Sequence, residues 1–168
     1  MKTKKKASKI IGWKEWINLE CLALPAIKSK IDTGAKTSAL HALNIETFFV
    51  EDVEYVSFEI HPLQKSKRLV RKCIARVIDR RMVSDSSGRK EKRIVITSNL
   101  KIGDNNSIRI ELTLTNRDNM VFRMLLGREA IKQLKMIVDV SKSFVQGKAK
   151  RNKILKLYRE TKPNFLEI

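Results

Sequence analysis

Apolar and polar residues alternate with a spacing of two in several stretches of the chain. The clearest run is 108–114, in which Ile, Ile, Leu and Leu alternate with Arg, Glu and Thr. Similar alternation covers 55–60 and 74–78, and turn-forming residues separate such runs at 85–88 and 103–106. This pattern favours strands with one buried face. It predicts an all-β fold of many short strands, with the spacing of a small closed barrel.

Two segments depart from the alternation. Apolar residues at Ala130, Ile131 and Leu134 have a helical spacing, which predicts one short helix after Gly127. The segment 148–168 mixes apolar residues with charges, and its pattern fits an amphipathic helix or a disordered arm equally well. The chain is therefore expected to hold a basic N-terminal arm over 1–9, one domain over 10–147, and a basic C-terminal tail over 148–168.

Charge is the most unusual feature of the composition. The 168 residues include 36 Lys and Arg against 18 Asp and Glu, a net charge of +18. Each predicted tail carries a net charge of +5, which leaves +8 for the predicted domain. Such a surface attracts anionic partners, and nucleic acid, an acidic membrane and an acidic peptide all fit this criterion.

Other features of the sequence indicate where in the cell the protein is located. Only four residues, 10–13, separate the basic start of the chain from the next charge, which is too short for the apolar core of a signal peptide. No run approaches the roughly 18 apolar residues of a membrane span. The two cysteines, Cys21 and Cys73, have no paired spacing, as is usual for free thiols in a reducing compartment. We expect a cytoplasmic protein with no membrane partner.

The segment "KIDTGAKTSAL" at 30–40 places a carboxylate in a tight turn after a predicted strand. Asp32, Thr33 and Gly34 are all turn-forming residues, so this triplet alone is equally typical of a surface turn. About ninety residues later, Met124, Leu125 and Leu126 precede Gly127 and Arg128 and lead into the predicted helix.

Together these motifs resemble the bacterial retropepsin-like aspartic proteases, a family often named ATP-dependent zinc proteases. The resemblance spans about 10–145 and is carried by "KIDTGAKTSALHA", "TLTNR" and "FRMLLGREA". It implies a retropepsin-like barrel and an aspartic endopeptidase in which two carboxylates share a proton and activate water. Only one Asp-Thr-Gly occurs in this chain, so the resemblance implies a homodimer in which Asp32 of the partner subunit supplies the second carboxylate.

The same resemblance implies roles for individual residues. Asp32 would be catalytic, Thr33 would brace the two loops across the dimer, and Gly34 would let the backbone approach the substrate. Residues 84–91 would form the flap, as the loop of a β-hairpin. The substrate-binding residues would be Ala35, Lys36, Arg80, Arg81, Arg93, Arg123, Gly127 and Arg128.

One position departs from the retroviral pattern. Lys36 stands where those enzymes carry an acid that pairs with the arginine after the later glycine, so it would face Arg128, and Glu129 is the candidate to replace the missing brace. The cations expected around the cleft, with Arg89, Lys90 and Arg117 among them, indicate an acidic and possibly poly-glutamate substrate. The family's association with glutamate ligases of the ATP-grasp class implies the same substrate chemistry.

Neither a metal site nor a cofactor is expected. His41 and His61 lie twenty residues apart, and no cysteine stands beside another ligand at zinc spacing. Two rival functions remain open. One is a basic β-barrel that binds nucleic acid, with the tails supplying much of the charge, although aromatic residues are only 6% of the chain. The other is a retropepsin-fold interaction module without catalysis.

Overall fold

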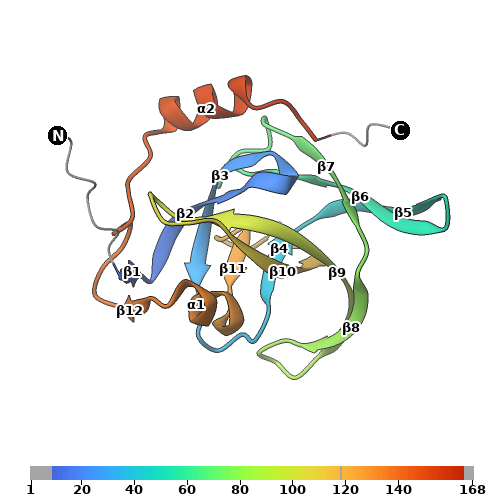
Figure 1. Ribbon diagram of the computed structural model, residues 1–168, viewed down its shortest axis with the longest axis horizontal. Helices are drawn as coiled ribbons and strands as arrows, with labels where there is room; N and C mark the ends of the chain where they lie inside the picture. Colours follow the sequence, from blue (N-terminus) through green and yellow to red (C-terminus); the bar gives the residue numbers. More distant parts are fainter. Residues whose placement is uncertain (1–8, 118, 165–168) are drawn as a thin grey trace.

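The computed structural model describes residues 9–117 and 119–164, and the fold is mostly β (Figure 1). The strands are β1 (Ile10–Gly12), β2 (Lys14–Leu19), β3 (Leu24–Ile31), β4 (Ser38–His41), β5 (Leu43–Val50), β6 (Val53–Ile60), β7 (Arg71–Arg76), β8 (Asp79–Ser84), β9 (Lys90–Lys101), β10 (Ile108–Thr115), β11 (Met124–Leu126) and β12 (Ile137–Asp139). The helices are a 3-10 turn at Glu20–Leu22, α1 (Arg128–Leu134) and α2 (Arg151–Glu160).

The largest sheet has the strand order β10-β4-β11-β3-β2-β9-β8, and β10 also pairs with β9. Because of this additional pairing, each of six strands pairs with two neighbours, and the six form a closed ring. They are β10, β4, β11, β3, β2 and β9. A second sheet joins β5, β6 and β7, and the β5–β6 hairpin extends away from the body (Figure 1). The third sheet is the parallel pair of β1 and β12.

The alternation seen in the sequence sets the burial of the strands. In β10, Ile110, Leu112 and Leu114 are buried, while Arg109 and Glu111 are exposed, although Thr113 is buried as well. The fully buried Phe58 of β6 joins the same apolar core, which also contains side chains of β2, β3 and β9. The mostly β fold predicted from the period-two pattern is confirmed.

Both helices agree with the sequence pattern. The predicted helix after Gly127 is α1, which ends where Lys135 adopts a left-handed conformation with φ 54°. The open question about the C-terminal segment is answered for 151–160, which form the amphipathic helix α2. Its Ile154 and Tyr158 are buried, and the Tyr158 hydroxyl donates to the carbonyl oxygen of Ala26 in β3 at 2.7 Å. The boundaries predicted at residues 10 and 147 stay predictions.

The sequence predicted no membrane-spanning segment. Within residues 9–117 and 119–164, no helix is long and apolar enough to cross a bilayer.

Two buried acidic groups predict how stability depends on alkaline pH. Burial raises the pKa of the Cys73 thiol to about 12, although the charge of Arg71 opposes the change. Burial also raises the pKa of Tyr158. Because the unfolded chain releases these protons at lower pH than the folded protein does, the free energy of unfolding falls as pH rises.

We expect Cys73→Ala to remove the thiol's share of this fall. Between pH 9 and about 12 that share amounts to about 1.4 kcal/mol per pH unit. Urea unfolding at a series of pH values measures the slope, which separates it from the pH-independent cost of the cavity. The control is Cys21→Ala, because Cys21 is exposed. Equal slopes in the wild type and Cys73→Ala would contradict the prediction.

Candidate functional site

The Asp-Thr-Gly loop lies where two parallel strands end. β3 runs directly into it, and β11 pairs in parallel with β3 through Leu126 and Ile31. The amide of Asp32 donates to the carbonyl oxygen of Leu126 at 2.9 Å. Since α1 begins two residues after Leu126, the loop and the start of the helix lie at the same end of the sheet.

Local hydrogen bonds fix the conformation of the Asp32 side chain. Its Oδ1 accepts a hydrogen bond from the amide of Gly34 at 2.9 Å, and its carbonyl oxygen accepts one from the amide of Ala35 at 3.3 Å. Asp32 and Ala35 are half-buried, while Thr33 and Gly34 are exposed. The loop is therefore a closed Asx-type turn whose tip is open to a ligand or to another chain.

Arg128 braces this loop through backbone carbonyls. Its Nη1 donates to the carbonyl oxygens of Thr33 and Gly34, each at 3.0 Å, and its own amide donates to Ala35 at 2.8 Å. The expectation that Glu129 replaces the brace is wrong. Its carboxylate lies 3.7 Å from the ammonium group of Lys132 instead. Backbone carbonyl oxygens thus accept from Arg128 Nη1 where an acid was expected to pair with it.

Gly127 is required by a close approach of two backbone segments. A Cβ atom there would lie 2.7 Å from the carbonyl carbon of Thr37, closer than any real side chain approaches. The amide of Gly127 donates to the Ser38 hydroxyl at 3.0 Å. The segment after the Asp-Thr-Gly loop and the segment that starts α1 are thus fixed to each other.

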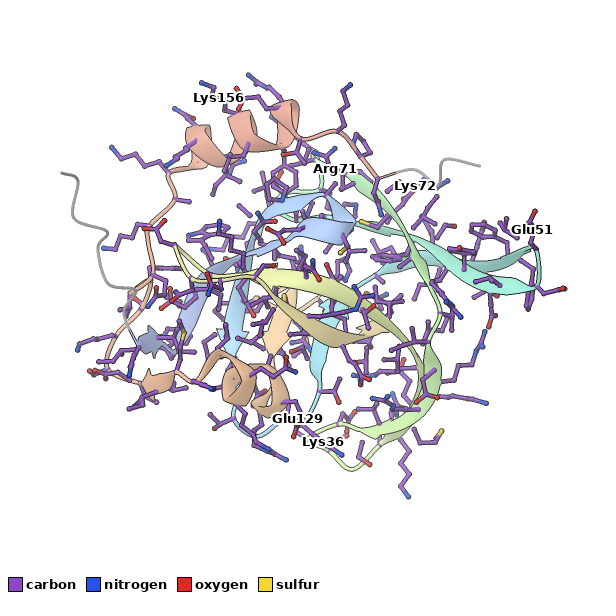
Figure 2. The ribbon with its side chains drawn as sticks, viewed as in Figure 1. Lys36, Glu51, Arg71, Lys72, Glu129 and Lys156 are labelled. Atoms are coloured by element: carbon purple, nitrogen blue, oxygen red, sulfur yellow. The ribbon has the colours of Figure 1, made fainter. Side chains whose placement is uncertain are left out.

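A cavity of about 580 Å³ opens beside this junction, between α1 and the strands β4, β8, β9 and β10. Its charged lining residues are Lys36, Arg81, Arg109, Glu111 and Glu129. Figure 2 shows Lys36 and Glu129 near each other beside α1. Three cations against two acids give this cavity a net positive lining, and we call it the cationic cavity.

Hydrogen bonds orient two of these cations. Arg81 forms ion pairs with Glu111 and with Asp79, which hold its guanidinium at the wall and raise its pKa. Arg109 donates from Nη2 to the Thr97 hydroxyl at 2.6 Å. Sequence analysis missed Arg109, because its outward position in an alternating strand resembles that of any solvated charge.

The cations predicted to converge on one cleft lie in more than one place. Lys36 and Arg81 share the cationic cavity, but Arg80 does not line it and pairs with Glu54 of β6. Arg80 and Arg81 are neighbours in β8, and neighbouring strand residues point to opposite faces. Arg123 is also not in this cavity, since it is buried and its Nη1 donates to the carbonyl oxygens of Arg117 and Met120.

A second group of charges lies near Asp32. Burial, followed by the charge of Arg93, lowers the pKa of Arg117, and the negative charge of Asp32 acts in the opposite direction. Arg93 and Asp32 are thus each within electrostatic range of Arg117. Arg93 is held by an ion pair with Glu91 at 2.7 Å. Arg93 is the predicted substrate-binding arginine whose charge acts on Arg117.

Comparison with known proteins identifies the family. Residues 10–149 match the sequence model of the RimB-like family, described as "Retropepsin-like aspartic endopeptidase RimB". The chain belongs to the RimB-like family. The resemblance drawn from the Asp-Thr-Gly and Leu-Leu-Gly-Arg motifs is confirmed. The predicted roles of Asp32, Thr33 and Gly34 and of the flap loop stay predictions.

Curated relatives of this RimB-like chain carry a different description. A protein of Shewanella pealeana is 47% identical over 149 residues, which are 89% of this chain and 32% of the relative. A protein of Desulfotalea psychrophila is 46% identical over 96% of this chain and 35% of its own length. Both are named "Probable alpha-L-glutamate ligase". The chain spans about a third of the length of these relatives.

A solved structure supports the fold of the RimB-like chain. The protein Lpg0085 of Legionella pneumophila, described as of unknown function, matches with a TM-score of 0.68 and 28% identity. The match covers 84% of this chain and 99% of that protein.

The names of the curated relatives correct the predicted activity. A ligase forms a bond, whereas the sequence analysis predicted a hydrolase that cleaves acidic polypeptides with a water activated by paired Asp32 side chains. Four relatives at 43–47% identity are named as glutamate ligases, so the prediction of an aspartic peptidase is wrong. The Asp-Thr-Gly motif correctly indicated the family and the turn. A turn that is shared within a family does not determine which reaction a protein catalyses.

The brace from Arg128 gives a structural prediction. We expect Arg128→Gln to destabilise the protein by about 1 kcal/mol and to speed amide hydrogen exchange at Gly34 and Ala35, since two carbonyls lose a charged donor. Hydrogen exchange with chemical denaturation measures both effects. Lys132→Gln on the same helix is the control, because it removes only an exposed ion pair. Equal exchange rates in the two variants would refute the role of the brace.

Proposed function

We propose that this chain acts in alpha-L-glutamate ligation, as the module that binds the glutamate-bearing polypeptide. The observation that carries the proposal is the cationic cavity, lined by Lys36, Arg81 and Arg109 in a chain whose curated relatives are named glutamate ligases. The bond-forming chemistry is assigned to a polypeptide that corresponds to the remaining two thirds of those relatives.

The chemistry of the cavity suits a run of glutamates. Arg109 offers a planar guanidinium group that can bind a carboxylate through two parallel hydrogen bonds. Arg81 already donates to Asp79 and Glu111, so it contributes positive charge at the wall. Lys36 adds a cation on an exposed loop, where a mobile ammonium group can follow successive carboxylates. Glu111 orients Arg81, so the guanidinium is held in place before a ligand arrives.

The charge of the whole chain supports the same ligand class. A net charge of +18 produces a positive potential that speeds the approach of an anionic polymer at low salt. The cationic cavity then discriminates among the anionic polymers that this potential attracts. Side-chain carboxylates at regular intervals are the feature that a glutamate run presents and that a neutral polypeptide lacks.

Two finer expectations also remain proposals. The closed retropepsin-like barrel is supported by the family match and by the pairing of β10 with both β4 and β9. A homodimer across Asp32 is supported by the exposed tip of the loop at Thr33 and Gly34. Sedimentation of the full chain measures its mass and tests the dimer.

The binding proposal predicts the effect of removing two cavity cations. We expect Lys36→Gln/Arg109→Gln to weaken binding of poly-L-glutamate about tenfold, since two charge-assisted contacts are lost. Isothermal titration calorimetry at several salt concentrations measures the affinity, with poly-L-glutamine as the neutral ligand.

The matched control is Lys72→Gln/Lys156→Gln, which removes the same charge outside the cavity (Figure 2). Its affinity should fall less than about twofold at moderate salt, because these ammonium groups act only through screened long-range attraction. Equal losses in both double variants would mean that net charge alone binds the polymer, and the cavity would have no role.

A further inference from the structure

Aromatic side chains gather on one face of β2 and β3, although they are few in the chain. Trp16 stacks on Phe144, with ring centroids 6.3 Å apart and planes inclined by 23°. Trp13, which directly precedes β2, meets Phe122 edge-to-face at 5.9 Å. The chain has two tryptophans, and both are in this group.

Lysines alternate with these rings. The Lys14 ammonium lies 4.5 Å from the Trp13 ring centroid and 5.2 Å from that of Phe144. The Lys28 ammonium lies 5.3 Å from the Trp16 ring centroid and 5.7 Å from that of Phe144. We call Trp13, Lys14, Trp16, Lys28 and Phe144 the aromatic face.

The cations of this face lie close enough to repel one another. Lys14 and Lys30 are directly opposite each other in the pairing of β2 with β3. Burial, followed by the charges of Lys14 and Lys65, lowers the pKa of Lys28. Like charges gathered in this way destabilise the folded protein, and an anionic ligand would relieve the repulsion.

A buried carboxylate holds the aromatic face in place. Glu15 is fully buried, and its two oxygens accept hydrogen bonds from the amides of Gly12, Val145 and Gln146 at 2.7, 2.9 and 3.2 Å. These bonds fix the loop in which Phe144 has a left-handed backbone with φ 53°. A non-glycine residue in this conformation is strained, so its ring position depends on the surrounding hydrogen bonds.

We propose that the aromatic face binds single-stranded nucleic acid. Bases stack on the accessible surfaces of Trp13, Trp16 and Phe144, and phosphates lie against Lys14, Lys28 and the exposed Lys30. Every unpaired base offers a flat π surface, and aromatic rings interleaved with cations are the pattern by which proteins hold single strands without reading their sequence.

The observations favour this ligand over other polyanions. A glutamate chain has carboxylates for the lysines but no flat groups for the rings. A duplex keeps its bases inside, so it can use the lysines only. The sequence alone placed nucleic-acid binding on the basic tails and showed no stacking surface, because the aromatic face joins residues from 13–16 with residues near 122 and 144.

The two tryptophans provide a direct test. Titration of the full chain with fluorescein-labelled dT20 or U20 should raise the anisotropy, and unlabelled oligonucleotides should quench the tryptophan emission as bases stack. Phe144→Leu keeps an apolar side chain but removes the ring, and we expect it to weaken binding about 5- to 150-fold. Lys14→Gln/Lys28→Gln should reduce the slope of log affinity against log salt by about 1.4.

The control variant Lys153→Gln/Lys156→Gln removes the same charge from α2 and should retain the quenching. Circular dichroism and thermal unfolding confirm that each variant is folded. Binding without quenching, or equal losses in the control and the aromatic-face variants, would overturn the proposal. Quenching by poly-L-glutamate as strong as that by dT20 would overturn it too, in favour of an acidic polypeptide. Each result is independent of the cavity variants, which share no residue with this face.

Discussion

The contact between Gly127 and the backbone at Thr37 is the constraint on which the candidate site depends. It brings the segment after the Asp-Thr-Gly loop within van der Waals distance of the segment that begins α1. A side chain at 127 would separate these segments. The amide of Glu129, which donates to the Lys36 carbonyl at 3.1 Å, and the guanidinium of Arg128 would then lose their acceptors. The cationic cavity forms beside this junction, so its shape follows from one missing Cβ atom.

The chain has more cationic side chains than its acidic side chains can pair with. With 36 Lys and Arg against 18 Asp and Glu, half of the cations at most can form separate ion pairs. The structure uses other partners for several of them. Arg128 donates to backbone carbonyls, and Lys14 and Lys28 lie over aromatic rings. These partners carry no full negative charge, so the positive potential remains available to a ligand.

Local patterns predicted local structure well. The alternation at 108–114 and the helical spacing after Gly127 depend on neighbours in the chain, and both elements formed as expected. The predicted substrate-binding residues do not all line one cavity. Arg80 and Arg81 were both expected at the cleft, yet neighbouring residues of a strand point to opposite faces.

Contacts between distant segments could not be predicted. Glu15 occupies a position that looks like one polar residue of an amphipathic strand, but it is fully buried by amides about 130 residues away. Likewise, no pattern in the sequence indicates that Phe144 packs against Trp16. The prediction of the activity was wrong for another reason. The Asp-Thr-Gly motif specifies a turn at the end of β3, and that turn occurs in a chain whose curated relatives are named as ligases.

β3 connects the aromatic face to the Asp-Thr-Gly loop. Its Ile27 and Ile31 are buried in the core, while Lys28 and Lys30 lie toward the aromatic face, and the strand continues directly into Asp32. β11 and β2 pair with its two edges, and Tyr158 of α2 bonds to Ala26 near its start. A strand held on both edges and by its apolar side chains cannot shift at one end alone. The aromatic face and the Asp-Thr-Gly loop therefore keep a fixed separation, which limits how one polymer could reach both.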